Sequence, residues 1–185
     1  MATEYAGGRI EFGGLPSAAE LLHAFRSGAD NAHPVLEAGY DLVRCHERRR
    51  HAQQAAHAPD APSSRVAACS QVVDDVDGAR TRLIDHIDTW VAEHVAHRAG
   101  ASLHTETLGA VIDRMAAKWV AAHHALGLRM ADPKGDRRTR VSVLSRRGGV
   151  DGEAHLQWVR LAELADGYKD LITDVTEHRR RLPVF

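Results

Sequence analysis

Residues 103–118, LHTETLGAVIDRMAAK, decide the fold class of this chain. Apolar residues recur in this stretch at spacings of three and four, which is the pattern of an amphipathic α-helix. We expect the helix to run from Leu103 to about Leu126, with Ser102 as its N-cap and Gly127 as its end.

Two carboxylates of this stretch fall on a face that also carries small residues. At about 100° per residue, Glu106, Val120 and His124 project within about 40° of Asp113, and Gly109 lies at the edge of the same face. A glycine there would let a neighbouring helix approach closely. We therefore expect Glu106 and Asp113 to face that neighbour and to need partners, because isolated buried charge is costly.

The same helical spacing recurs through the rest of the chain. Ser17 is the expected N-cap of a short helix, and Pro34 suits the first turn of a long one. Besides the stretch above, helices are predicted over residues 18–28, 34 to about 57, about 65–98 and about 153–181. Because no convincing strand pattern occurs, the chain is expected to be all-α, an antiparallel helical bundle of four long helices plus a short N-terminal helix.

The domain organisation follows from the segments that lack a helical period. Residues 1–16 are rich in glycine and predict an irregular N-terminal arm, whereas residues 17–185 predict a single helical bundle domain. Residues 128–152 are basic, and we expect a long loop there, because the VSVL stretch within it would have no strand to pair with.

Composition argues against several function classes. The formal net charge of −1 over 185 residues provides no field for nucleic acid or an anionic membrane surface. No apolar run approaches the roughly 20 residues that cross a bilayer, and no secretory signal is visible. Two cysteines without CxxC spacing argue against a disulfide framework. We expect a cytoplasmic protein with neither a nucleic-acid nor a membrane partner.

Three of the 13 histidines lie on apolar helical faces. His46, His94 and His104 are expected to point inward from three different helices. Each is either a core histidine bonded to a carbonyl or carboxylate, or part of a polar pocket between facing helices. Imidazoles beside carboxylates suit proton transfer or metal ligation.

Other chemistry lacks a sequence signal. Glu-x-x-His segments do not occur in the arrangement expected of di-iron bundles, so no metal ligand is assigned and no cofactor is expected. There is no Gly-x-Ser-x-Gly nucleophile motif and no phosphate-binding glycine loop.

Three stretches resemble a bacterial family known as domain of unknown function 4254. They are LHTETLGAVIDRMA (103–116), RRRLPVF (179–185) and RTRLIDHID (80–88), the last similar to a basic-Ile-Asp helix of that family. The resemblance spans most of the chain from about residue 35 and implies a helical fold, but no reaction. By position it marks these residues as site residues: Asp85, His104, Thr105, Glu106, Thr107 and Asp113.

The chain also departs from the family pattern. The segment Cys45-His46-Glu47-Arg48 stands where the family has Trp-His-x-Glu-Asp, and the chain stops at Phe185 where the family usually continues into a basic tail. We therefore expect a divergent member, and a changed or lost site is one of the alternatives that stay open.

The first functional hypothesis is a small-molecule biosynthetic enzyme of the secondary-metabolism type, with an acid–base pocket inside the bundle. Glu106 or Asp113 would be the general base, its pKa raised by burial beside a second carboxylate. The expected catalytic residues are His104, Glu106, Asp113, Asp85 and His46. An acidic substrate would be bound by Thr105, Thr107, Arg114, Arg138 and Arg140.

Two other hypotheses stay open. One is a non-catalytic helical accessory or dimerising partner protein, and a homodimer is compatible with the enzyme as well. The other is a metal- or haem-binding helical bundle that uses the inward histidines.

Overall fold

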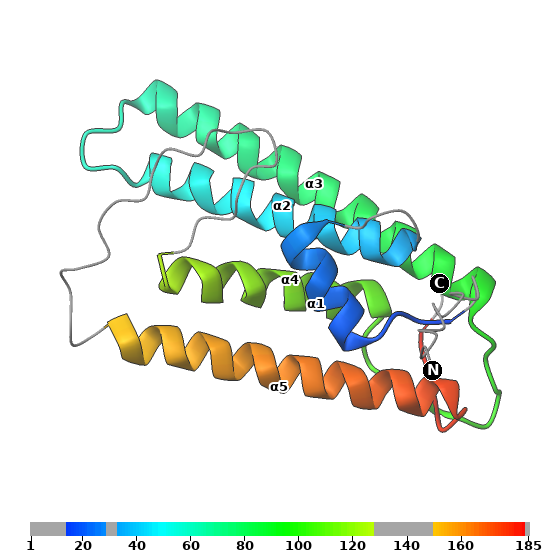
Figure 1. The fold of residues 1–185 in the computed structure, drawn as a ribbon. Helices are drawn as coiled ribbons and strands as arrows, with labels where there is room; N and C mark the ends of the chain where they lie inside the picture. Colours follow the sequence, from blue (N-terminus) through cyan, green and yellow to red (C-terminus); the bar gives the residue numbers. More distant parts are fainter. Residues whose placement is uncertain (1–13, 29–32, 128–149, 184–185) are drawn as a thin grey trace, which may run out of the picture.

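The computed structural model describes residues 14–28, 33–127 and 150–183 and is mostly helical there (Figure 1). Its elements in chain order are α1 (Ala18–Ser27), α2 (Pro34–Ala56), α3 (Ser63–His94), β1 (Ser102–Leu103), α4 (Leu108–Ala125), α5 (Val150–Thr176) and β2 (Arg180–Arg181). The predicted all-α class is confirmed, with a minor two-stranded sheet added.

Figure 1 shows α2 and α3 side by side as a hairpin, α4 running beside α5, and α1 lying across α2 and α4. All five helices contribute side chains to one core. Phe25, Leu42, Ile87, Ile112 and Tyr168, one from each helix, are each no more than 1% exposed. Burial of a large apolar side chain contributes about 1.5–3 kcal/mol.

The first helix begins where the sequence predicts. The Ser17 hydroxyl accepts a hydrogen bond from the Glu20 backbone N–H, and the Glu20 carboxylate accepts one from the Ser17 N–H, which completes a capping box. At the preceding residue, the carbonyl of Pro16 accepts a hydrogen bond of 2.9 Å from the buried Tyr168 hydroxyl. Helix α5 is thereby attached to the start of α1.

Helix α2 begins at Pro34, as predicted, and its N-cap is a buried histidine. The His33 Nδ1 atom accepts a hydrogen bond of 3.3 Å from the Val35 N–H, and its Nε2 atom donates to the Gly14 carbonyl at 3.0 Å. The ring also packs against Trp90 of α3, with the two ring centroids 4.5 Å apart.

The predicted start of α4 is wrong. The helix begins at Leu108, and its N-cap is Thr107, whose hydroxyl accepts a hydrogen bond of 3.2 Å from the Ala110 N–H. The preceding residues instead pair in parallel with β2, so that Ser102 lies opposite Arg180 and Leu103 opposite Arg181. Pairing with a segment so far along the chain satisfies backbone groups that a helix would otherwise have used.

The ends of the other long helices also differ from their predicted positions. Helix α3 ends at His94 and not near residue 98, and α5 ends at Thr176 and not near residue 181. His178 has a φ of 57°, a left-handed conformation that no helix continues through, and β2 follows it.

Gly109 brings α3 and α4 into close contact, as the sequence predicts. A Cβ atom at this position would lie 2.7 Å from the backbone carbonyl oxygen of Ile84 and 2.9 Å from an oxygen of Asp88. Only glycine fits there without displacing α3, and the contact places the next two turns of α4 beside both α2 and α3.

Two predicted segments fall mostly outside the described residues, namely the N-terminal arm of residues 1–16 and the basic loop of residues 128–152. In the described part of the chain, no helix combines the length and apolarity needed to cross a membrane.

Candidate functional site

A cluster of charged and imidazole side chains occupies the junction of α2, α3 and α4. The Asp113 carboxylate of α4 accepts a hydrogen bond of 2.8 Å from His46 Nε2 of α2. Its two oxygens also accept bonds of 3.0 Å and 2.6 Å from Nε and Nη2 of Arg80, on α3. The exposed fractions of the three side chains are 11% for His46, 13% for Asp113 and 23% for Arg80, so the junction is largely shielded from water.

The cluster continues along the seam between α2 and α3. Arg80 Nη1 donates a hydrogen bond of 2.8 Å to Asp77, one helical turn away, and Asp77 accepts a second bond of 3.0 Å from Arg49 Nε of α2. The pKa of Asp77 is lowered by these two guanidinium groups, which outweigh the opposing effect of burial. Two arginines thus alternate with two aspartates, and the imidazole lies at one end.

The pKa of Asp113 is lowered, whereas the sequence predicts that burial raises it. Burial alone would raise the pKa of Asp113, but hydrogen bonds from His46 and Arg80 outweigh it and lower the pKa to about 2. Asp113 therefore stays ionised at neutral pH, and the raised pKa that the sequence predicts is wrong for this residue. The same pairing raises the pKa of Arg80 above its ordinary value.

An ionised Asp113 also determines which nitrogen of His46 carries a proton. Because the carboxylate can only accept, Nε2 of His46 must be protonated, and Nδ1 of the neutral ring keeps its lone pair. No described residue forms a hydrogen bond with this Nδ1 atom. His46, and not a carboxylate, is the group in the junction that is suited to accept a proton.

Glu106 and His104 lie in a different arrangement. Glu106 precedes α4, so its predicted place on the helical face of Asp113 is wrong, and its carboxylate forms a two-bond ion pair of 2.9 Å and 2.7 Å with Arg114. The His104 Nδ1 atom lies 2.8 Å from the Glu106 carbonyl and 3.3 Å from the Glu106 N–H. No hydrogen bond or ion pair among the described residues joins either side chain to Asp113.

The remaining predicted site residues have separate positions. Asp85 and Thr105 are exposed, and Thr107 is the N-cap of α4. Arg138 and Arg140 lie outside the described residues. The inward orientation expected of His94 is wrong, because this residue is exposed and its imidazole stacks on Trp90 at a centroid distance of 4.7 Å.

Sequence reasoning missed Arg80 and Asp88, the first and last residues of the RTRLIDHID stretch. Asp88 accepts a hydrogen bond of 2.8 Å from the Gly109 N–H, so α3 supplies a carboxylate to the first turn of α4. Burial raises the pKa of Asp88 despite this bond. A signal was available, because both residues lie on the helical stripe of Ile84 and Val91, which faces the bundle.

The part of the chain that the structure describes contains no set of side chains placed to bind a metal ion. No group of three or more histidine, cysteine, aspartate or glutamate residues is arranged there to hold an ion.

The fold and this junction define an α-helical protein in which a histidine–aspartate pair is braced by arginine between three helices. The family model described as "Protein of unknown function (DUF4254)" matches residues 37–184, and the chain therefore belongs to that family. No curated protein and no solved structure matches the chain.

Proposed function

We propose that the protein is an enzyme that performs acid–base chemistry on a small molecule, with His46 as the proton acceptor. The observation that carries the proposal is the 2.8 Å bond from His46 Nε2 to an aspartate whose charge is fixed by Arg80. A carboxylate in this position keeps the imidazole in one tautomer and stabilises the imidazolium that forms when the ring takes a proton.

The roles of the residues follow from their hydrogen bonds. Asp113 orients His46, and Arg80 holds Asp113 ionised and in place through two bonds. Proton uptake at Nδ1 of His46 would leave a positive ring beside a negative carboxylate, so the charge that develops is compensated within the cluster. Biosynthesis of a secondary-metabolism type and action as a homodimer belong to this proposal as expectations.

The test compares His46→Gln with wild type on a mixture of candidate substrates. Purified protein is incubated with a deproteinised small-molecule extract, and each component is followed by mass spectrometry. We expect wild type to convert at least one component, and His46→Gln to convert it at least about a hundredfold more slowly, the lower end of the contribution of a positioned acid or base.

The matched control is His51→Gln, an exposed histidine of the same helix. It should retain the wild-type rate, and circular dichroism should show that both variants keep their helical content. Equal rates for wild type and His46→Gln, or no conversion of any component by folded wild type, would contradict the proposal. The accessory-protein and the metal or haem hypotheses stay predictions.

A further inference from the structure

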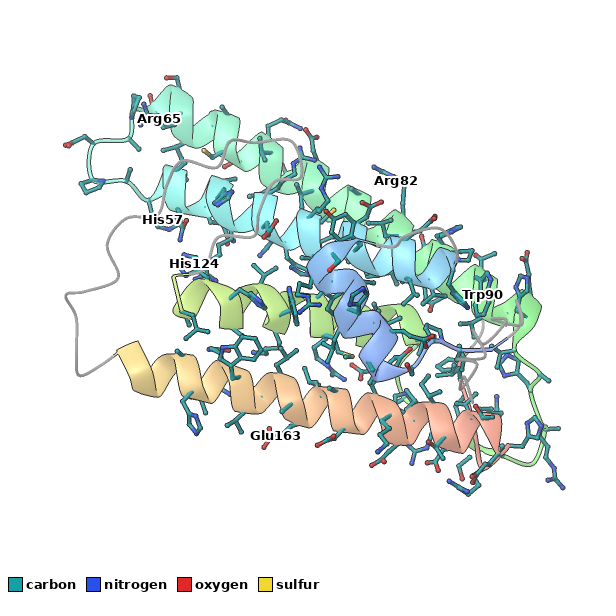
Figure 2. All side chains as sticks on the ribbon, viewed as in Figure 1. His57, Arg65, Arg82, Trp90, His124 and Glu163 are labelled. Atoms are coloured by element: carbon teal, nitrogen blue, oxygen red, sulfur yellow. The ribbon has the colours of Figure 1, made fainter. Side chains whose placement is uncertain are left out.

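A hollow lies between the C-terminal end of α2 and the N-terminal half of α3, at the end of the hairpin where His57 and Arg65 are labelled in Figure 2. Its volume is about 330 Å³, at the lower end of the range of about 300–1,000 Å³ that small-molecule sites occupy. The charged cluster described above lies further along the same seam, since Arg49 and Asp77 are one turn from the hollow on their respective helices.

The walls of the hollow are apolar and built from small side chains. Ala52 and Ala56 line it from α2, and Val66 and Val73 line it from α3. Val66 is 39% exposed, which is a large exposure for an apolar side chain. Alanines on one wall leave room that a larger side chain would fill, so the hollow suits a compact apolar group that would remove Val66 from water.

Two of the polar groups that line the hollow, those of His57 and Asp74, accept hydrogen bonds. The His57 Nδ1 atom lies 2.7 Å from the Gln53 carbonyl, and because a carbonyl cannot donate, this nitrogen must carry the proton. The Nε2 atom of the neutral ring is then an acceptor. Asp74 adds an exposed carboxylate that has no ion pair or hydrogen bond with any described residue.

Neither guanidinium of the charged cluster forms an ion pair with Asp74. Arg49 is paired with Asp77 at 3.0 Å, and Arg80 completes the neutralisation of Asp77. Two acceptors therefore border an apolar hollow, and no cation of a described residue is bound to either of them. A ligand with a protonated nitrogen would complete this arrangement.

We propose that this hollow binds a small amphipathic amine, with its alkyl or aryl group against the alanines and valines and its ammonium at Asp74. The site is separate from the proton-transfer pair, and the proposal does not depend on the enzyme activity proposed above. It assigns a ligand class of about ten non-hydrogen atoms, in keeping with the low end of the usual pocket volumes.

Two probes with the same apolar body and opposite charge test the assignment: 2-phenylethylamine and 3-phenylpropanoate. Cys69 lines the hollow and is partly exposed, so its alkylation by iodoacetamide reports whether the hollow is occupied. Cys45 is 7% exposed and lies outside the hollow, and it serves as the internal reference in the same mass spectrum. Titration calorimetry on the intact chain gives the affinities.

We expect the amine to slow alkylation of Cys69 and to bind about three- to tenfold more tightly than the carboxylate. Asp74→Asn should remove that preference, whereas the control Asp75→Asn, next to it and outside the hollow, should keep it. Both aspartates are exposed, so neither change should disturb the fold. Equal protection by the two probes, no protection by either at millimolar concentration, or an unchanged preference in Asp74→Asn would overturn the proposal.

Discussion

Asp113 shows how one side chain connects the fold of this protein to its proposed chemistry. Its carboxylate accepts hydrogen bonds from α2 and α3 while it lies on α4, so three helices meet at one group. Taking such a charge out of water is costly, and the bonds to His46 and Arg80 offset that cost. Without them the junction would contain an unpaired buried charge.

Asp113→Asn should therefore lower stability and flatten its dependence on pH. The folded-state pKa of about 2 lies below the unfolded value of 3.8, so the carboxylate's contribution is complete above about pH 4 and is lost as the pH falls toward 2. We expect a loss of about 2 kcal/mol at pH 7 in the variant, measured by urea unfolding.

The same measurements at pH 3 separate charge from side-chain shape. The difference in the free energy of unfolding between wild type and Asp113→Asn should be smaller at pH 3, because wild type has then lost part of the stabilisation by the ionised Asp113 carboxylate. Asp170→Asn, at an exposed position of α5, is the control and should change the free energy of unfolding by less than about 0.5 kcal/mol. A difference that stays constant from pH 7 to pH 3 would contradict this electrostatic account.

The sequence indicates single residues of the junction better than it indicates their partners. His46 could be placed on an inner stripe because its neighbours at helical spacing are apolar, and Asp113 because it shares a face with Gly109. That Arg80 completes the pair depends on the relative rotation of two helices, which periodicity does not report. Glu106 was misplaced for a different reason, since its position depends on where α4 begins.

Local sequence signals predict that the helices exist, but they do not always predict where a helix begins or ends. Ser17 and Pro34 mark the starts of α1 and α2 correctly, because capping is a property of neighbouring residues. The start of α4 is different, because residues 102 and 103 pair with residues 180 and 181. A pairing across so many residues has no local signature, and the helical pattern before Thr107 was therefore misleading.

Replacement of glycine by alanine should have opposite effects on stability at Gly109, which contacts a neighbouring helix, and at Gly78, where the new Cβ has room. At Gly109 the new Cβ would meet the backbone of Ile84 at 2.7 Å, so Gly109→Ala should destabilise the protein by about 1–3 kcal/mol. At Gly78, the nearest atom to the new Cβ is the end of the Arg82 side chain at 3.6 Å. Gly78→Ala should therefore stabilise α3 by about 0.5–1 kcal/mol.

Thermal and urea unfolding of the two variants, side by side with wild type, check this pair. Both replace a helical glycine by alanine, so intrinsic helix propensity favours alanine at both positions, although less at Gly109, which is the second residue of α4. A stable Gly109→Ala protein would mean that α4 can move away from α3 without loss, and the close approach would then not be what positions Asp113 beside Arg80.

At the level of the whole molecule, the two family-specific stretches near residues 103 and 180 come together. The His104 N–H donates a hydrogen bond of 2.8 Å to the Arg181 carbonyl, and the Ser102 N–H donates one of 3.2 Å to the Arg179 carbonyl. This pairing joins the segment between α3 and α4 to the segment after α5. The sequence resemblance identified both stretches, although it did not indicate that they are neighbours in space.

Leu182 shows why this joint should matter for global stability. It follows β2 directly and is only 1% exposed, as part of the same core as the five helices. Leu182→Ala should lower the free energy of unfolding by about 2–4 kcal/mol, through lost burial and the cavity left behind. Leu126→Ala is the control, because Leu126 is 41% exposed and its loss should cost less than about 1 kcal/mol.

Hydrogen exchange in the Leu182→Ala variant tests how far the effect of the joint extends. If β2 holds the loop before α4, the amides of Ser102 and His104, which donate to the C-terminal segment, should lose protection together with those of the first turn of α4. An unchanged exchange rate at these amides, alongside a large loss of global stability, would mean that Leu182 acts only as a core residue. Loss of protection at these two amides and in the first turn of α4 would mean that the start of α4 and the segment after α5 unfold as one cooperative unit. Helix α4 links this unit to the turn that carries Asp113.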